Sequence, residues 1–591
     1  MFFSKITRLF FIASVMLMAF DASAQQKTYC NPINIDYGYC PIPNFVTQGK
    51  HRATADPIIT FFKGEYYLFS TNQWGYWHSK DMLDWKFIPR KFLRPEHKVY
   101  DELCAPSVSF VRDTMLVVGS THTKEFPIWM STNPTVDSWK ELVHKSEAGA
   151  WDPHIFWDKD TDKVYEYYGS SNVYPMYGFE LDRKTFQPKT EPIPMFNLND
   201  DEHGWERFGE TNDNVFLQPF MEGAYMSKHK GRYYLQYGAP GTEFSGYGDG
   251  VYTSDKPLGP WEYQSFNPFS YKPGGFARGA GHGGTYDDAF EAVWHVSTIA
   301  ICMKNNFERR VGIWPAGFDK DGILYSNTAY GDYPTFLPAQ KKSHLNLDSF
   351  AGWMLLNYNK PVTVSSTLGG FVPNLSVDED IKTYWSAKTG NKGEWIISDL
   401  GEKSTINAIQ INYGDQDADI MGKPDSTVGH KYVISISDDN KNWKVLVDKS
   451  KSTKDVPHEY IELEKAANAR YIKLENYGMP TGKFAISGLR VFGKGSSAKP
   501  TAVQNFVPLR AEPKKKGERR SVWLKWAQES TADGYVIYWG KSPDKLYGSI
   551  MVYGKTEYFF NGLDRSEAYY FTIEAFNGNG IGPRSEAKEA K

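Results

Sequence analysis

The segments "ATADPIITFF" (residues 53–62) and "GAWDPHIFWD" (residues 149–158) share one pattern, an Asp-Pro pair directly before a short apolar run. A tyrosine pair follows each run, in "GEYYLFS" (residues 64–70) and "VYEYYGS" (residues 164–170). Short runs rich in β-branched and aromatic residues, bounded by turn residues, are typical of β-strands. The chain therefore repeats a unit of two strands joined by a turn.

This two-strand unit recurs five times between residues 28 and 340. Its second strand appears again as "DTMLVVGS" (residues 113–120), "GRYYLQYG" (residues 231–238) and "FEAVWHVS" (residues 290–297). Five repeated β-units favour a five-bladed β-propeller, in which the innermost strands line a central channel. We therefore expect an all-β protein. The five units open at Asp56, Ala105, Asp152, Glu222 and His282.

Three of the five opening residues are carboxylic acids, Asp56, Asp152 and Glu222. Asp before Pro is common in turns, but equivalent positions of a propeller converge on its axis. Three acids brought together raise one another's pKa, which is costly without a purpose. Two carboxyl groups across a sugar ring are the minimum apparatus for glycosidic bond hydrolysis, and a third can tune the acid.

At the level of motifs, "ADPII…GEYYLFS", "WDPHIFWD…YEYYGS" and "MEGAYMSKHKGRYYLQYG" resemble glycoside hydrolase family 43. The resemblance implies that Asp56 is the general base, Asp152 modulates the pKa of the acid, and Glu222 is the general acid. It also implies inversion at the anomeric carbon, which requires the carboxyl groups to lie roughly 6.5–9.5 Å apart. Ala224 stands where the family frequently has proline, which leaves the subfamily open.

Further candidates surround these acids. Trp74, Trp77 and Trp151 are expected to floor the sugar subsite, although each also suits a blade core. "GAGHGGTYDD" (residues 279–288) resembles the family's axial histidine segment, so His282 is a candidate for substrate contact and for binding a calcium ion. Of the pair at 309 and 310, Arg310 is favoured to reach a sugar hydroxyl. The acidic insert 197–214 could rim the pocket, bind calcium or simply face solvent. No cofactor is expected to be required, and calcium is the candidate structural metal.

Two smaller segments follow the predicted propeller domain (residues 25–345). "GEWIISDLGEKSTINAIQINYG" and "KYVISISDDNKNWKVL" resemble a discoidin, or coagulation-factor type C, jelly roll with a galactose-binding-like fold over residues 346–495. After a linker at 496–502, "SVWLKWAQ" and "EAYYFTIEAFNGNGIGPRS" resemble a fibronectin type III sandwich over residues 503–591. Ligand binding in such jelly rolls comes from variable end loops rather than from these scaffold residues.

The N-terminal residues 1–24 have the features of a secretory signal peptide, with Lys5 and Arg8 before an apolar stretch and Ala22-Ser23-Ala24 at the cleavage site. The protein is therefore expected to be exported, either to a periplasm or outside the cell, without a membrane span. Export would permit a disulfide between Cys30 and Cys40, which are close in sequence. The net charge of −3 gives no general attraction to nucleic acid.

Together these features predict a secreted, monomeric, inverting exo-glycosidase that acts on plant cell-wall polysaccharides or oligosaccharides. The resemblance implies an α-L-arabinofuranosidase or a β-D-xylosidase. A β-galactofuranosidase, or another galactan-directed glycosidase of the same fold, is an alternative. Two other classes stay open: a non-catalytic glycan-binding protein, and an adhesion protein built on the two C-terminal domains.

Overall fold

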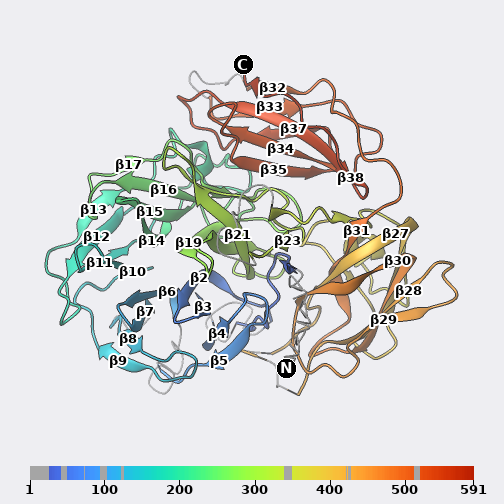
Figure 1. Cartoon of the computed structure of the whole chain (residues 1–591), viewed down its shortest axis with the longest axis horizontal. Helices are drawn as coiled ribbons and strands as arrows, with labels where there is room; N and C mark the ends of the chain where they lie inside the picture. Colours follow the sequence, from blue (N-terminus) through green and yellow to red (C-terminus); the bar gives the residue numbers. More distant parts are fainter. Residues whose placement is uncertain are drawn as a thin grey trace, which may run out of the picture.

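The computed structural model describes residues 26–40, 50–71, 73–92, 103–121, 125–338, 349–420, 422–423, 427–511 and 519–591. The signal peptide predicted at 1–24 lies outside these residues. Figure 1 shows three groups of β-sheets: a ring of blades from blue to green, a sandwich in orange and a smaller sandwich in red. The predicted all-β fold, with a five-bladed propeller, a jelly roll and a fibronectin type III sandwich, is confirmed. The predicted domain boundaries stay predictions.

Five antiparallel sheets form the blades, each built from strands consecutive in sequence. The first blade holds β2 (Ala55–Phe62), β3 (Glu65–Thr71), β4 (Gly75–Ser79) and β5 (Lys86–Pro89). The second holds β6 (Cys104–Val111), β7 (Thr114–Ser120), β8 (Ile128–Ser131) and β9 (Lys140–Val143). The third holds β10 (His154–Asp158), β11 (Lys163–Tyr168), β12 (Met176–Leu181) and β13 (Ile193–Phe196).

The fourth blade follows a short 3₁₀ helix, η1 (Gly204–Glu206), and the fifth closes the ring against the first. The fourth holds β14 (Glu222–His229), β15 (Arg232–Ala239), β16 (Gly248–Ser254), β17 (Glu262–Tyr263) and β18 (Ser270–Tyr271). The fifth holds β19 (Gly281–Asp287), β20 (Val293–Ala300), β21 (Arg309–Phe318) and β22 (Leu324–Ser326). Strand β1 (Thr28–Tyr29) pairs with β23 (Thr335–Phe336), which ties the start of the described chain to the end of the propeller.

The innermost strands begin with a residue in the left-handed backbone region. Asp56, Ala105, Asp152, Gly223 and His282 have φ between 41° and 74°. Few non-glycine residues adopt this conformation, and Asp does so more readily than most. In four of the five blades a bulge interrupts the strand register at this point. The repeated pattern in the sequence thus marks the backbone turn that leads into each blade.

Glu222 does not occupy the position equivalent to Asp56. In the strand pairing, Glu222 lies opposite Gly238, as Ala55 lies opposite Thr71 and Gly281 opposite Thr298. Gly223 takes the left-handed position in the fourth blade, and Glu222 stands one residue before it. The predicted equivalence of the three acids is therefore wrong for Glu222, because glycine is the residue that adopts positive φ with least strain.

The jelly roll consists of one eight-stranded sheet system that covers the core of Trp385, Ile409, Ile434 and Ile472. It also contains the 3₁₀ helix η3 (Pro373–Ser376). Its strands are β24 (Met354–Leu355), β25 (Val362–Val364), β26 (Trp385–Ser386), β27 (Trp395–Tyr413), β28 (Lys431–Ser437), β29 (Lys444–Asp448), β30 (His458–Gly478) and β31 (Ala485–Lys494).

The C-terminal sandwich packs a three-stranded and a five-stranded sheet around Trp539, Ile537 and Phe571. Its strands are β32 (Val507–Arg510), β33 (Val522–Lys525), β34 (Gly534–Gly540), β35 (Gly548–Tyr553), β36 (Glu557–Phe560), β37 (Tyr570–Asn577), β38 (Gly580–Ile581) and β39 (Lys588–Glu589).

Buried ion pairs join the jelly roll to the propeller. Arg52, fully buried, binds Asp415 (Nε–Oδ2, 2.9 Å) and Asp455 (NH1–Oδ2, 2.7 Å) of the jelly roll. Arg310 donates from Nε to Nε2 of His458 at 2.7 Å. Removing one member of a buried pair leaves an uncompensated charge and typically costs about 3–5 kcal/mol. The two domains are therefore joined by interactions that would be costly to break.

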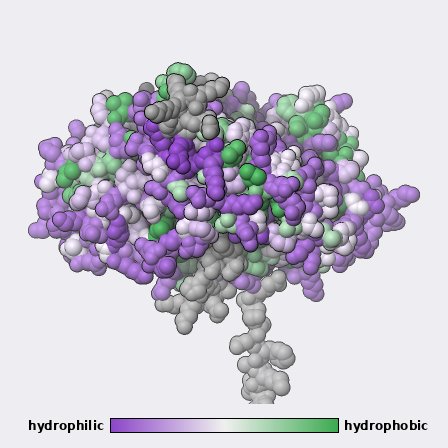
Figure 2. All heavy atoms as spheres, turned by 90° about the horizontal axis from the view of Figure 1, so that it is seen from above, coloured by the Kyte–Doolittle hydropathy of each residue, from purple (hydrophilic) through white to green (hydrophobic). Residues whose placement is uncertain are grey.

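The C-terminal sandwich contacts the fourth and fifth blades. Asp564 accepts a hydrogen bond from His203 at 2.8 Å, and Lys545 pairs with Asp319 at 2.8 Å. Arg520 donates to the carbonyl oxygen of Asp200 at 2.7 Å. The outer surface drawn in Figure 2 is mainly hydrophilic, with hydrophobic residues in small groups.

Cys30 carries a thiol and is not joined to Cys40 by the disulfide that export would permit. Its Sγ lies 3.3 Å from the carbonyl oxygen of Asp332. Burial raises the pKa of this thiol to about 12, so it stays protonated. In the part of the chain that the structure describes, no helix is both long and apolar enough to cross a membrane.

Candidate active site

A ring of hydroxyl groups supports the turns at the centre of the propeller. The backbone N–H of Asp56 donates to Thr298 Oγ1 (2.9 Å), that of Ala105 to Thr71 Oγ1 (2.7 Å) and that of Asp152 to Ser120 Oγ (2.8 Å). In each case the acceptor comes from the second strand of the preceding blade. These bonds hold the carboxylates in place by linking neighbouring blades, so the site depends on closure of the ring.

Asp56 is buried and surrounded by donors. Thr71 Oγ1 donates to its Oδ2 at 2.6 Å, and Arg309 NH1 and His282 Nδ1 each lie 3.4 Å from its Oδ1. Burial alone would raise the pKa of Asp56, but the Arg309 and His282 charges and the Thr71 hydrogen bond outweigh it and lower the pKa. Asp56 is therefore ionised at neutral pH.

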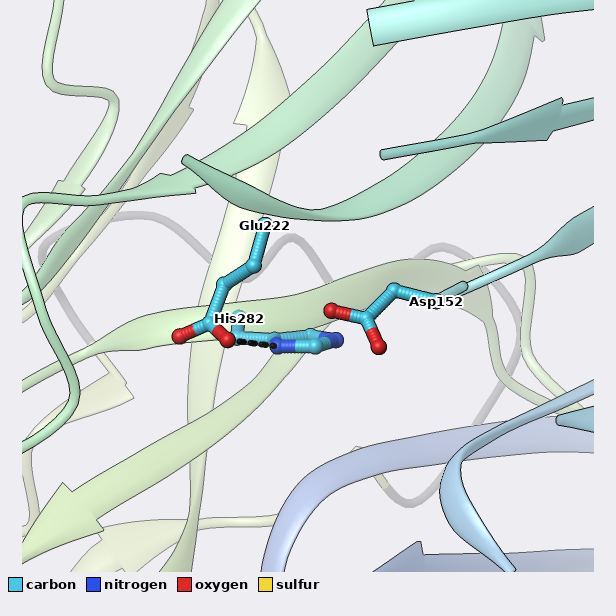
Figure 3. A group of neighbouring side chains, drawn as sticks. All are labelled: Asp152, Glu222 and His282. Carbon is cyan, nitrogen blue, oxygen red and sulfur yellow. Dashed lines mark ion pairs between the residues drawn. The ribbon is translucent and has the colours of Figure 1, made fainter. Parts of the chain in front are cut away.

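Asp152, Glu222 and His282 form a compact group around the same point (Figure 3). One polar atom from each lies within 4.8 Å of the others, and His282 Nδ1 is 3.9 Å from Glu222 Oε2. Burial, with smaller contributions from Glu222 and Asp56, raises the pKa of Asp152 to about 7 against the opposing effect of His282. Asp152 thus holds a proton far more readily than an exposed aspartate.

His282 carries the balancing charge. Burial lowers its pKa, but Asp56, Glu222 and Asp152 together outweigh burial and raise the pKa to about 10. Tyr247 donates a short hydrogen bond from its hydroxyl to Glu222 Oε1. The cluster therefore combines an ionised aspartate, a proton-holding aspartate and a glutamate oriented by a tyrosine.

The acids open onto a cavity of about 520 Å³. This volume falls within the range of small-molecule sites. One side of the cavity carries Asp56, Asp152 and Glu222, and the other carries apolar side chains. The apolar lining comprises Trp151, Phe208, Leu217, Phe220 and Phe307.

Of the three predicted tryptophans, one lines this cavity. Trp151 is 40% exposed and stands against Phe126 in an edge-to-face contact with ring centroids 6.1 Å apart. Trp77 is completely buried in the core of the first blade, where its Nε1 donates to Asp36 Oδ1. Trp74 lines a different cavity, between the first blade and the jelly roll. The prediction is wrong for Trp77 and Trp74, because aromatic residues beside a motif serve blade packing as readily as substrate binding.

The structure does not place Arg310, the predicted substrate-binding arginine, in the cavity. Arg310 is fully buried and points to His458 in the jelly roll, whereas Arg309 lines the cavity and contacts Asp56. Successive residues of a strand face opposite sides. Arg309 therefore points into the cavity, and its neighbour Arg310 points into the interface with the jelly roll.

The group of Asp152, Glu222 and His282 could hold a cation only through one imidazole and two carboxylates. Calcium takes six to eight oxygen ligands, and metal binding requires a neutral imidazole. A protonated His282, with Arg309 beside it, already neutralises these carboxylates. The donor set therefore fits the predicted calcium poorly.

Several residues of the site were not identified from the sequence motifs. The structure adds Thr71, Tyr247, Glu243 and Arg309 to the polar lining or its immediate support. Phe208 comes from the acidic insert 197–214, which therefore rims the pocket, as one of the three interpretations held. Thr71 and Thr298 stand at matching places in their second strands, and that register is the signal by which a sequence could have found them.

Comparisons with protein families place three models on the chain. Residues 43–324 match the model described as "Glycosyl hydrolases family 43". Residues 361–486 match the F5/8 type C domain, and residues 513–591 match the fibronectin type III domain. Among curated proteins, none has a sequence similar to this chain.

Several solved structures are similar to this chain at low sequence identity. "Xyloglucan PUL GH43B" from Bacteroides ovatus is 16% identical, with 79% of this chain and 98% of that chain covered and a TM-score of 0.42. An endo-1,4-β-xylanase from Bacteroides thetaiotaomicron is 21% identical, covering 47% and 96%, with a TM-score of 0.40. An α-L-arabinofuranosidase from Clostridium thermocellum is 16% identical, covering 46% and 93%, with a TM-score of 0.34.

Proposed function

Since residues 43–324 belong to glycosyl hydrolase family 43 and the protein is a glycoside hydrolase, we propose that it is an inverting exo-glycosidase. Its substrates would be terminal α-L-arabinofuranosyl or β-D-xylosyl groups of plant cell-wall polysaccharides or oligosaccharides. The observation that carries the proposal is the meeting of ionised Asp56, proton-holding Asp152 and the carboxyl group of Glu222 in the lining of one cavity.

In this proposal Asp56 is the general base. Its lowered pKa keeps it ionised, so it can take a proton from water as that water attacks the anomeric carbon. Glu222 donates a proton to the departing oxygen, and Tyr247 orients its carboxyl group. Asp152 has a carboxylate oxygen within 4.8 Å of one from Glu222, and its proposed role is to modulate and position that acid.

Spacing is compatible with inversion. Asp56 Oδ1 and Glu222 Oε2 lie 3.4 Å and 3.9 Å from the same nitrogen of His282, so these two oxygens are at most 7.3 Å apart. Inverting enzymes need about 6.5–9.5 Å between the carboxyl groups to hold the water. The upper limit of 7.3 Å lies in the lower part of that range.

We further propose that the reaction needs no metal, because His282 and Arg309 supply the positive charge beside the acids. Export rests on the predicted signal peptide at residues 1–24, and a monomer is the expected state. Chelation should leave the rate unchanged. A rate restored by calcium after chelation would contradict the metal-free proposal.

The direct test is hydrolysis of 4-nitrophenyl glycosides by the full chain. The panel holds the α-L-arabinofuranoside, the β-D-xyloside, the β-D-galactofuranoside and the β-D-galactopyranoside, and Asp56→Asn is the control. Hydrolysis of the first or second substrate, lost in the variant, is expected. Hydrolysis only of a galactose derivative would move the substrate to the galactan class.

The reaction stereochemistry and the site of attack are measured separately. Proton NMR of the first product formed should show the inverted anomer, and retention would contradict the role of Asp56 as base. Release of single sugars from an oligosaccharide is expected, and release of longer fragments would contradict exo action. A folded protein with no activity on any substrate would favour the non-catalytic glycan-binding class.

A further inference from the structure

A second large cavity lies away from the catalytic acids. It has a volume of about 1030 Å³ and separates the first blade from the jelly roll. A smaller cavity of about 230 Å³ adjoins it, and both are lined by Asn34, Leu83, Tyr460 and Glu462. Because they share these lining residues, we treat the two cavities as one and call it the interdomain cleft. It shares no lining residue with the catalytic cavity.

Aromatic side chains line the propeller side of the interdomain cleft. Trp74 precedes β4, Trp85 precedes β5, and Phe87 lies within β5. Each of these three side chains is partly exposed. Partly exposed aromatic rings in a concave surface offer flat apolar faces to a ligand. Lys423 already covers the ring of Phe87, with its Nζ 3.9 Å from the ring centroid, so the two tryptophans are the candidates for ligand contact.

The jelly-roll side of the same cleft is polar. It presents Lys449, Thr453, Lys454, Glu459 and Glu462 beside the start of β30. Among the described residues, the two cavities together are lined by five carboxylates (Asp36, Asp84, Asp455, Glu459, Glu462) and five lysines (Lys27, Lys86, Lys423, Lys449, Lys454). Charges of both signs are nearly balanced, so the cleft offers hydrogen bonds without attracting a strongly charged polymer.

Two buried polar atoms lack a partner where the two cavities meet. Asn34 Oδ1 and Glu462 Oε1 accept no hydrogen bond from the described residues, although Glu462 Oε2 accepts from Thr28 N and Oγ1 at 2.8 Å each. An unsatisfied buried acceptor is costly. Both atoms suit a donor from a ligand lying along the cleft, such as a hydroxyl group.

We propose that the interdomain cleft is a second carbohydrate site, which binds a stretch of neutral polysaccharide away from the bond that is cleaved. A sugar ring has an apolar face for Trp74 and Trp85, and hydroxyl edges for Asn34, Glu462 and the polar wall. The larger cavity alone, at about 1030 Å³, has room for more than one sugar unit. The site belongs to both domains, unlike the end-loop site expected of a jelly roll alone.

The test measures polysaccharide binding by the full chain in an Asp56→Asn background, which prevents hydrolysis. Affinity electrophoresis uses gels that contain arabinoxylan, arabinan or galactan, with polygalacturonate as the charged comparison. Trp85→Ala removes a ring from one wall. Thr453→Trp fills the cleft from the other wall at an exposed position. Trp523→Ala, a tryptophan of the C-terminal sandwich that stacks on Phe559, is the matched control.

Retardation by at least one neutral polysaccharide is expected, with an apparent Kd weakened about tenfold by both cleft variants and unchanged by Trp523→Ala. The proposal of a second carbohydrate site would be overturned if neither cleft variant weakened binding, or if only polygalacturonate retarded the protein. Thr453→Trp guards against a folding defect in Trp85→Ala. In chains with Asp56 restored, turnover of a small aryl glycoside should not change, so failure here is separate from failure of the proposed function.

Discussion

Glu222 is the residue on which the catalytic proposal can be tested most sharply. Glu222→Gln removes the proton but keeps the size and the contact with Tyr247. Turnover of substrates with poor leaving groups should fall by about 10²–10⁴-fold, the usual contribution of general acid catalysis. Aryl glycosides with good leaving groups should lose much less. Steady-state kinetics on both substrate types gives the comparison.

Glu243→Gln is the matched control, because Glu243 lines the same cavity but lies outside the acid cluster. Its effect should not depend on the leaving group. Equal losses on good and poor leaving groups in Glu222→Gln would contradict the acid assignment.

Arg309 makes a prediction about pH. Its charge helps lower the pKa of Asp56, so Arg309→Gln should raise that pKa. The base would then lose its ionised form at a higher pH, and the acid limb of the kcat/KM profile should move upward. Arg309→Lys retains the charge and should move the limb less. An unchanged limb in Arg309→Gln would mean that Asp56 does not set it.

The site residues divide into those that the sequence shows and those that it hides. Asp56 and Asp152 are visible because each carries the repeated Asp-Pro turn. Arg309 and Arg310 are neighbours in one strand, and only the register of β21 decides which side chain enters the cavity. Trp74 and Trp77 look alike in sequence, yet one borders the interdomain cleft and the other fills a blade core.

At the scale of the strand, the turn that opens each blade fixes the site geometry. Gly223 has φ +74°, and a Cβ atom there would lie 2.5 Å from His282 Cδ2. Gly223→Ala should therefore displace His282, weaken its contacts with Asp56 and Glu222, and strongly reduce kcat. Kinetics and thermal unfolding of the variant provide the measurement.

Gly64→Ala is the control for backbone strain. Gly64 also has positive φ (+85°), but nothing lies within 4 Å of its added Cβ. It should lose stability of about 1 kcal/mol or somewhat more and keep its activity. If the two variants lost activity equally, strain rather than the clash with His282 would be the cause.

The strand pattern made the five blades predictable, because alternating apolar runs and turn residues report local structure. It misplaced Glu222 by one position, because Gly223 and not the acid takes the left-handed backbone position that opens the fourth blade. The hydroxyl ring of Thr71, Ser120 and Thr298 was also missed, since each bond joins strands from different blades.

At the scale of the molecule, the jelly roll is part of the structure that holds the catalytic strand. Asp415 binds Arg52 and lies 3.8 Å from Arg310, the neighbour of Arg309. Asp415→Asn should lower the free energy of unfolding by about 3–5 kcal/mol, because Arg52 keeps its buried charge. Denaturant unfolding of the full chain measures the loss, and kcat/KM should fall with it.

Asp419→Asn controls for the loss of a carboxylate in the same segment. The Asp419 side chain is 78% exposed, and the substitution removes an ion pair with Lys50 in which Nζ lies 3.7 Å from Oδ1. It should change stability little. Equal stability of the two variants would show that the buried pairs do not join the domains energetically. These contacts could not be predicted, because they connect residues separated by hundreds of positions.

The contacts between insert 197–214 and the C-terminal sandwich can form only late in synthesis, because the sandwich is the last domain to be translated. Phe208 borders the catalytic cavity, and the insert around it is held by Arg520, Asn561 and Asp564. Domains generally fold in the order in which the ribosome makes them. The three acids can thus assemble early, whereas the wall that carries Phe208 is secured only after the last hundred or so residues have been translated. A chain terminated before the C-terminal sandwich would therefore contain the catalytic acids but lack the contacts that hold this wall of the pocket.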